Sequence, residues 1–128
     1  MKSRLGISLF LGVGLLMGGG SLFAHHGTAG TYDGTKTITL EGTVVEFVWA
    51  NPHGSLWFEV KDNEGDVVRW GGELHSILLL IRAGWTRSSV KPGDQVTVTL
   101  NPSTRGLPTG QLLTVTLSDG TVLGRDPS

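Results

Sequence analysis

Apolar and polar positions alternate through most of the chain after residue 36. In the first such run, residues 37–49, the apolar side chains follow two successive phases: Ile38 and Leu40, then Val45, Phe47 and Trp49. A period of two over β-branched and aromatic residues predicts a half-buried strand. Gly42 lies where the phase changes, so we expect a bulge or a sharp coil there, which lets one strand join both sheets of a small barrel.

Turn residues separate the next apolar runs, which predict strands over residues 55–60, 67–74, 96–100 and 113–117, with a short hairpin arm over residues 121–123. An apolar run over residues 77–81 predicts a short helix between the third and fourth strands. Ser76 can cap its start, Gly84 suits its end, and we expect the helix to be mostly buried.

This order predicts a mostly β domain, a small five-stranded OB-type barrel with one short helix between strands 3 and 4. In that fold the second and third strands, with the loops after the first and fourth strands, build the usual ligand surface. A β-sandwich is the alternative. We favour the barrel because a sandwich of this length normally has more strands and no buried helix.

The first 24 residues have the three parts of a signal peptide: a basic start with Lys2 and Arg4, a short apolar run, and small residues before Ala24. Cleavage after Ala24 is favoured, with cuts after Ser21 or Ala29 as alternatives. We therefore expect a signal peptide over 1–24, a flexible arm over 25–36, the barrel over 37–124 and a tail over 125–128. The product is expected to be periplasmic or secreted, without membrane insertion after cleavage.

Charge and cysteine content exclude several classes of function. Without Lys2 and Arg4, 8 of the 10 basic residues remain against 11 acidic ones, a net charge of −3, and no basic run attracts nucleic acid. The absence of cysteine excludes a disulfide framework, a thiolate metal site and a thiol nucleophile. No Ser-His-Asp arrangement or pair of catalytic carboxylates stands out, so an enzyme is the least favoured of three hypotheses.

Histidines are the strongest candidates for chemistry. Cleavage after Ala24 would give His25 a free amine beside its imidazole, His26 would add a second imidazole, and His53 a third from the loop after the first strand. Such nitrogen donors suit copper above other first-row divalent ions. The sequence thus predicts a copper-binding protein, with His75 as a weaker candidate beside the helix. Alternatively, the first two histidines are solvated and His53 only shapes its turn.

A second hypothesis is a ligand-binding or protein-interaction module of the cell envelope that uses no metal. Its candidate surface is Trp57, which falls in the outward phase of its strand, together with Asn51 in the neighbouring loop. Half-buried packing of Trp57 on Arg69 across the hairpin would explain its position without a ligand. The other three tryptophans are expected in or against the core.

Several short motifs, in order, resemble those of an uncharacterised family of small exported bacterial proteins, a domain of unknown function. They are His25-His26, Tyr32-Asp33, Gly42-Thr43-Val44, Asn51-Pro52-His53, Gly84-Trp85, Lys91-Pro92-Gly93-Asp94, Asn101-Pro102 and Asp119-Gly120. The resemblance implies an exported small β-domain. It supplies no activity and no catalytic residue.

Overall fold

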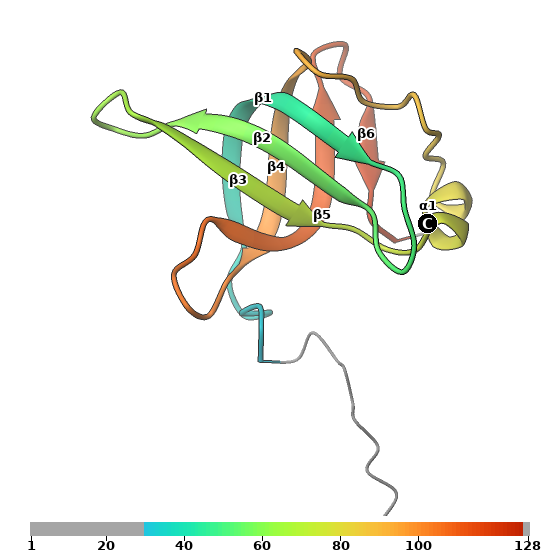
Figure 1. Cartoon of the computed structure of the whole chain (residues 1–128), viewed down its shortest axis with the longest axis horizontal. Coiled ribbons are helices and arrows are strands. Elements are labelled where there is room, and N and C mark those ends of the chain that lie inside the picture. The colour runs from blue at the N-terminus through green and yellow to red at the C-terminus, as the bar shows by residue number, and fades with distance from the viewer. Residues whose placement is uncertain (1–29, 127–128) are drawn as a thin grey trace, which may run out of the picture.

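The computed structural model describes residues 30–126, which form a single six-stranded sheet and one helix (Figure 1). The elements are β1 (Ile38–Val48), β2 (Ser55–Lys61), β3 (Val67–Glu73), α1 (Ile77–Arg82), β4 (Gln95–Pro102), β5 (Thr109–Leu117) and β6 (Val122–Gly124). The strand order is β3-β2-β1-β4-β5-β6, and β3 also pairs with β5 in parallel. This last pairing closes the first five strands into a barrel.

The predicted OB-type barrel is confirmed, with α1 between β3 and β4, and the β-sandwich alternative is wrong. Strand β6 is an addition that pairs with the outer edge of β5. Closure depends on three residue pairs between β3 and β5, beginning at Gly71 and Thr109. The end of the third strand therefore lies next to the start of the fifth.

Strand β1 belongs to both sides of the barrel, as its length predicts. Residues 38–43 pair with β4 and residues 43–48 pair with β2. Gly42 lies just before this exchange, and a Cβ there would stand only 2.5 Å from the Glu59 carbonyl oxygen. The bulge itself is at Val45, which has no partner between the pairs that Val44 and Glu46 make with β2. The predicted phase was wrong at this point, because Val44 is the residue buried in the core.

Side chains from β1, β2, β4 and β5 meet in one core together with Leu74, which directly follows β3, and α1 closes one end of it. Its buried apolar members are Val44, Leu56, Phe58, Leu74, Leu80, Trp85, Val90, Val96, Val98, Leu100, Leu112 and Val115. Of the other tryptophans, Trp49 and Trp70 pack against this core, as predicted.

Helix α1 is less buried than we predicted. Leu80 is fully buried, whereas Leu78 and Ile81 are 59% and 55% exposed. A helix of fewer than two turns lying on the end of a barrel presents only one side to the core. No helix among residues 30–126 is long and apolar enough to cross a membrane.

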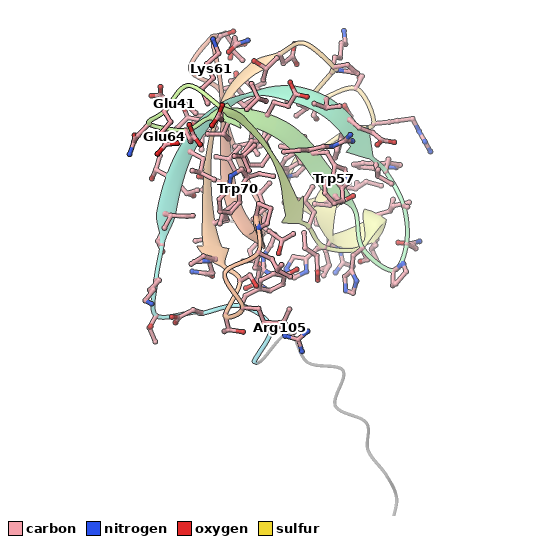
Figure 2. All side chains as sticks on the ribbon, turned by 60° about the vertical axis from the view of Figure 1, so that its left-hand side comes forward. Glu41, Trp57, Lys61, Glu64, Trp70 and Arg105 are labelled. Carbon is pink, nitrogen blue, oxygen red and sulfur yellow. The ribbon has the colours of Figure 1, made fainter. Side chains whose placement is uncertain are left out.

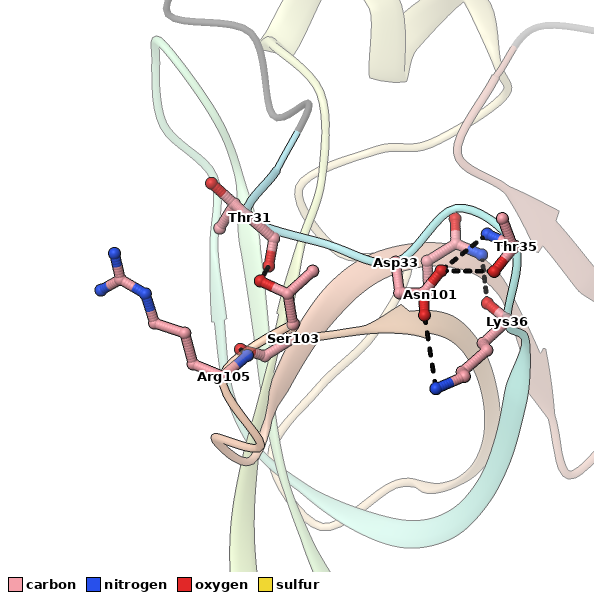
Figure 3. Close-up of polar contacts among 8 residues, drawn as sticks. Thr31, Asp33, Thr35, Lys36, Asn101, Ser103 and Arg105 are labelled. Atoms are coloured by element: carbon pink, nitrogen blue, oxygen red, sulfur yellow. Dashed lines mark hydrogen bonds and ion pairs between the residues drawn. The ribbon is translucent and has the colours of Figure 1, made fainter.

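Residues 30–36, which the sequence places in the N-terminal arm, lie along the loop between β4 and β5 (Figure 3). Tyr32 forms an isolated antiparallel bridge with Ser103. The buried Asn101 side chain donates a hydrogen bond from Nδ2 to the Lys36 carbonyl oxygen at 2.6 Å. These contacts bring the start of the described chain to the edge of the β2 and β3 face.

Candidate functional site

A pocket of about 210 Å³ opens on the outer face of β2 and β3, where the typical OB ligand surface lies. Five segments contribute to it: the N-terminal segment, the loop after β1, the two strands and the start of β5. The lining residues are Tyr32, His53, Gly54, Ser55, Trp57, Gly71, Glu73 and Thr109. The barrel topology thus gathers side chains from distant parts of the sequence on one surface.

Tyr32 and Glu73 form the main polar contact of the pocket. The Tyr32 hydroxyl donates a hydrogen bond to Glu73 Oε2 at 2.8 Å. Burial, the hydrogen bond and the carboxylate charge, in decreasing order, raise the pKa of Tyr32 to about 12. The tyrosine is therefore a neutral donor at neutral pH, and it holds residues 30–36 against β3.

His53 lies beside the same carboxylate. Its Nδ1 is 4.0 Å from Glu73 Oε1, and the two side chains are 53% and 30% exposed. Bonds from an imidazole nitrogen and a carboxylate oxygen to a first-row divalent ion such as zinc are about 2.0–2.2 Å long. The separation of the two atoms is therefore no larger than the sum of two such bonds.

Trp57 lines the pocket from β2, and Figure 2 labels its side chain. Its register partner on β3 is Gly71, and a Cβ at that glycine would lie 2.7 Å from the indole Cζ3. The indole therefore lies over bare backbone. The Arg69 guanidinium stands 5.5 Å from the ring centroid and also pairs with Glu46 at 3.7 Å. Trp57 thus has the contact with Arg69 that the sequence allowed, and it lines the pocket as well.

Asn51 and His75 lie outside the pocket lining. The Asn51 side-chain oxygen accepts a hydrogen bond from the Ile77 backbone N–H at 3.0 Å, so it caps α1 from the neighbouring loop. Ser76 stands at the N-cap position, but its side chain makes no capping bond. His75 Nε2 donates a hydrogen bond to Asp126 Oδ1 at 2.6 Å, and this bond lowers the pKa of that carboxyl group.

Of the predicted metal ligands, His53 lies in the pocket, whereas His25 and His26 lie outside the described residues. Within residues 30–126 no group of three or more His, Cys, Asp or Glu side chains could hold a metal ion. The described part of the chain therefore supplies at most two donors at the pocket, His53 and Glu73.

Sequence reasoning missed Tyr32 and Glu73. Glu73 could have been found from the hairpin turn at residues 62–65. Counting outward from that turn along both strands pairs Ser55 with Glu73. Since Ser55 comes two positions after His53, this register places Glu73 close to His53. Tyr32 is the only tyrosine of the chain, but nothing in its local sequence indicates that it lies against β3.

Residues 14–112 match a family of unknown function, DUF6152. The chain belongs to this family. The match covers more than half of the sequence and includes the DUF6152 segment that carries Tyr32, His53, Trp57 and Glu73. The predicted resemblance to a domain of unknown function is thereby confirmed. No curated protein and no solved structure matches this DUF6152 chain.

Proposed function

We propose that the protein is an exported, periplasmic binding protein that holds a copper ion at the mouth of the β2 and β3 pocket. The ligands are His25, His26 and His53. The proposal assumes cleavage after Ala24, which leaves the His25 amine and imidazole as neighbouring nitrogen donors. Three or more nitrogen donors favour Cu(II) over other first-row divalent ions.

The observation that carries the proposal is the hydrogen bond from Tyr32 to Glu73. It anchors the N-terminal segment in the pocket that His53 also lines. Tyr32 comes six positions after His26, and an extended chain spans about 3.3–3.6 Å per residue. The two N-terminal histidines therefore start from an anchor beside His53 with about 20 Å of reach, which is ample for them to turn back to it.

The second candidate is a binding module of the cell envelope for a non-metal ligand or a protein partner. The half-buried indole of Trp57 in the pocket lining supports it, since OB barrels commonly bind ligands on this face. Asn51 contributes less to such a surface than the sequence suggested, because its side-chain oxygen is engaged at the start of α1.

The test uses mature protein with an authentic His25 terminus, verified by mass spectrometry, mixed with one equivalent of Cu(II). Calorimetry measures affinity, and electron paramagnetic resonance reports the nitrogen ligands. We expect His53→Ala to weaken binding, and we expect a one-residue N-terminal extension, which turns the His25 amine into an amide, to do the same.

His75→Ala is the matched control, because His75 is bonded to Asp126 and lies outside the pocket lining. It should leave the copper affinity unchanged. If His53→Ala and the N-terminal extension also leave it unchanged, the histidines bind copper as independent surface ligands, and the non-metal binding module becomes the better conclusion.

A further inference from the structure

We infer that the pocket on β2 and β3 binds a small organic ammonium ion, with the Glu73 carboxylate as its anionic partner and the Trp57 indole as its apolar contact. The inference rests on the second candidate function, the binding module without metal, and gives that module a ligand class. It uses residues 30–126 alone, so it depends neither on copper nor on the N-terminal histidines.

The Glu73 carboxylate has one oxygen available to a ligand. Oε2 accepts the 2.8 Å hydrogen bond from the Tyr32 hydroxyl. Oε1 lies 4.0 Å from His53 Nδ1, which is too far for a hydrogen bond. Within residues 30–126 no other side chain hydrogen-bonds this carboxylate, and the Glu73 side chain is 30% exposed. Oε1 can therefore accept an N–H from a ligand, on a carboxylate that Tyr32 already holds in place.

The charge of the pocket lining favours a cation. No Lys or Arg is among the described residues that line the pocket, and His53 is charged only when protonated. The guanidinium of Arg69 lies 3.7 Å from the carboxylate of Glu46, so its charge has a partner outside the lining. A partly buried carboxylate without a permanent cation beside it attracts a positive ligand and repels an anion more strongly than a carboxylate in bulk water does.

The Trp57 indole suits an organic cation better than a bare inorganic one. It lines the pocket from β2 and lies over the backbone of Gly71. An indole attracts a positive charge through its ring and offers apolar area to the carbon atoms beside that charge. The guanidinium of Arg69 already stands 5.5 Å from the ring centroid, within the range of such contacts.

The size of the pocket limits the ligand. Its volume is about 210 Å³, whereas pockets for drug-sized ligands usually measure about 300–1,000 Å³. A cavity of about 150 Å³ holds one benzene molecule. The ligand therefore carries about one ring or a short chain beside its ammonium group. The hydroxyl groups of Ser55 and Thr109 also line the pocket and can accept further N–H bonds from a primary ammonium.

The experiment titrates three probes of nearly equal size and different charge into the mature protein, kept metal-free with a chelator: benzylamine, benzyl alcohol and benzoate. Two-dimensional NMR spectra of the backbone amides and indole N–H groups give both the affinity and the place of binding. We expect benzylamine to bind at least about 10-fold more tightly than benzyl alcohol, because a hydrogen bond to a charged group is the stronger one. Benzoate should not bind, and the shifts should centre on Trp57, Gly71 and Glu73.

Glu73→Gln should remove most of the preference for benzylamine over benzyl alcohol. The substitution removes the charge, and the amide oxygen can still accept the Tyr32 hydrogen bond. Glu59→Gln is the matched control, because Glu59 lies on the same outer face of β2 but outside the pocket lining, and its substitution changes the net charge equally. It should leave the affinities for all three probes unchanged.

Equal affinities for benzylamine and benzyl alcohol in the unsubstituted protein, or a preference that Glu73→Gln leaves intact, would overturn the inference. Benzyl alcohol that binds in the pocket as tightly as benzylamine would still support a binding module without metal. Absence of binding by all three probes would overturn the inference as well. Copper is absent from these measurements, so their outcome leaves the proposed copper site to its own test.

Discussion

Substitution of Gly42 by alanine tests how β1 joins both sides of the barrel. The added Cβ would lie 2.5 Å from the Glu59 carbonyl oxygen and 3.0 Å from Phe58 Cδ2. The first obstacle is backbone of β2, which is held in register with β1, so relief requires the two strands to separate. Overpacking of this kind costs about 1–3 kcal/mol. For a domain of this size, that corresponds to a melting temperature roughly 5–20 °C lower.

Gly34→Ala is the matched control, because a Cβ at Gly34 would meet nothing within 4 Å. Both substitutions restrict the unfolded chain equally, an effect that stabilises by about 0.4–1 kcal/mol, so their difference isolates the steric clash. Thermal unfolding followed by circular dichroism gives both values. Equal melting temperatures for the two variants would refute the close approach of β1 and β2 at Gly42. A valine at this position should lower stability further.

Phe58→Ala should lower the free energy of unfolding by about 3–5 kcal/mol in a denaturant titration, because its side chain is fully buried; a loss below 1 kcal/mol would contradict the assigned strand phases. Asn51→Ala should cost about 0.5–2 kcal/mol and Ser76→Ala much less, because only the first side chain caps α1; equal losses would count against this assignment. The tyrosinate absorbance of Tyr32, the only tyrosine, should titrate near pH 12, and Glu73→Gln should lower the midpoint by removing the negative charge. Because folding raises this pKa, its contribution to stability is complete below pH 10 and is lost as pH rises towards 12; a midpoint near 10 in the folded protein would contradict the Tyr32 contact.

The barrel was predictable from the sequence because its strands obey a period of two and its turns contain glycine at the expected places. The position of the bulge was not. An inserted residue such as Val45 leaves the alternating patterns on both sides intact, so the sequence locates the change of phase only within a few residues. We placed the bulge at Gly42 because glycine is common at bulges. The close contact at Gly42 is made with Glu59 on the neighbouring strand β2, so the sequence around Gly42 cannot indicate it.

The pocket was predictable only in part. His53 and Trp57 follow from the loop and the outward phase, but Glu73 needed the hairpin register and Tyr32 needed a contact across 41 residues of sequence. Asn51 was assigned to the ligand surface because polar loop residues often line such sites. Its oxygen instead caps α1, a tertiary contact that replaces the local bond expected of Ser76.

The parallel pairing of β3 with β5 has a thermodynamic consequence for any ligand of this protein. It is the shortest of the five ladders that close the barrel, with three residue pairs, and it runs through Gly71, Glu73 and Thr109, which also line the pocket. A ligand bound in the pocket contacts both β3 and β5, across the pairing that we expect to open first in the barrel. Ligand binding should therefore slow amide hydrogen exchange in the β3–β5 pairing before it slows exchange in the rest of the barrel. Because the ligand binds only the closed pairing, its affinity and the free energy of local opening are thermodynamically linked.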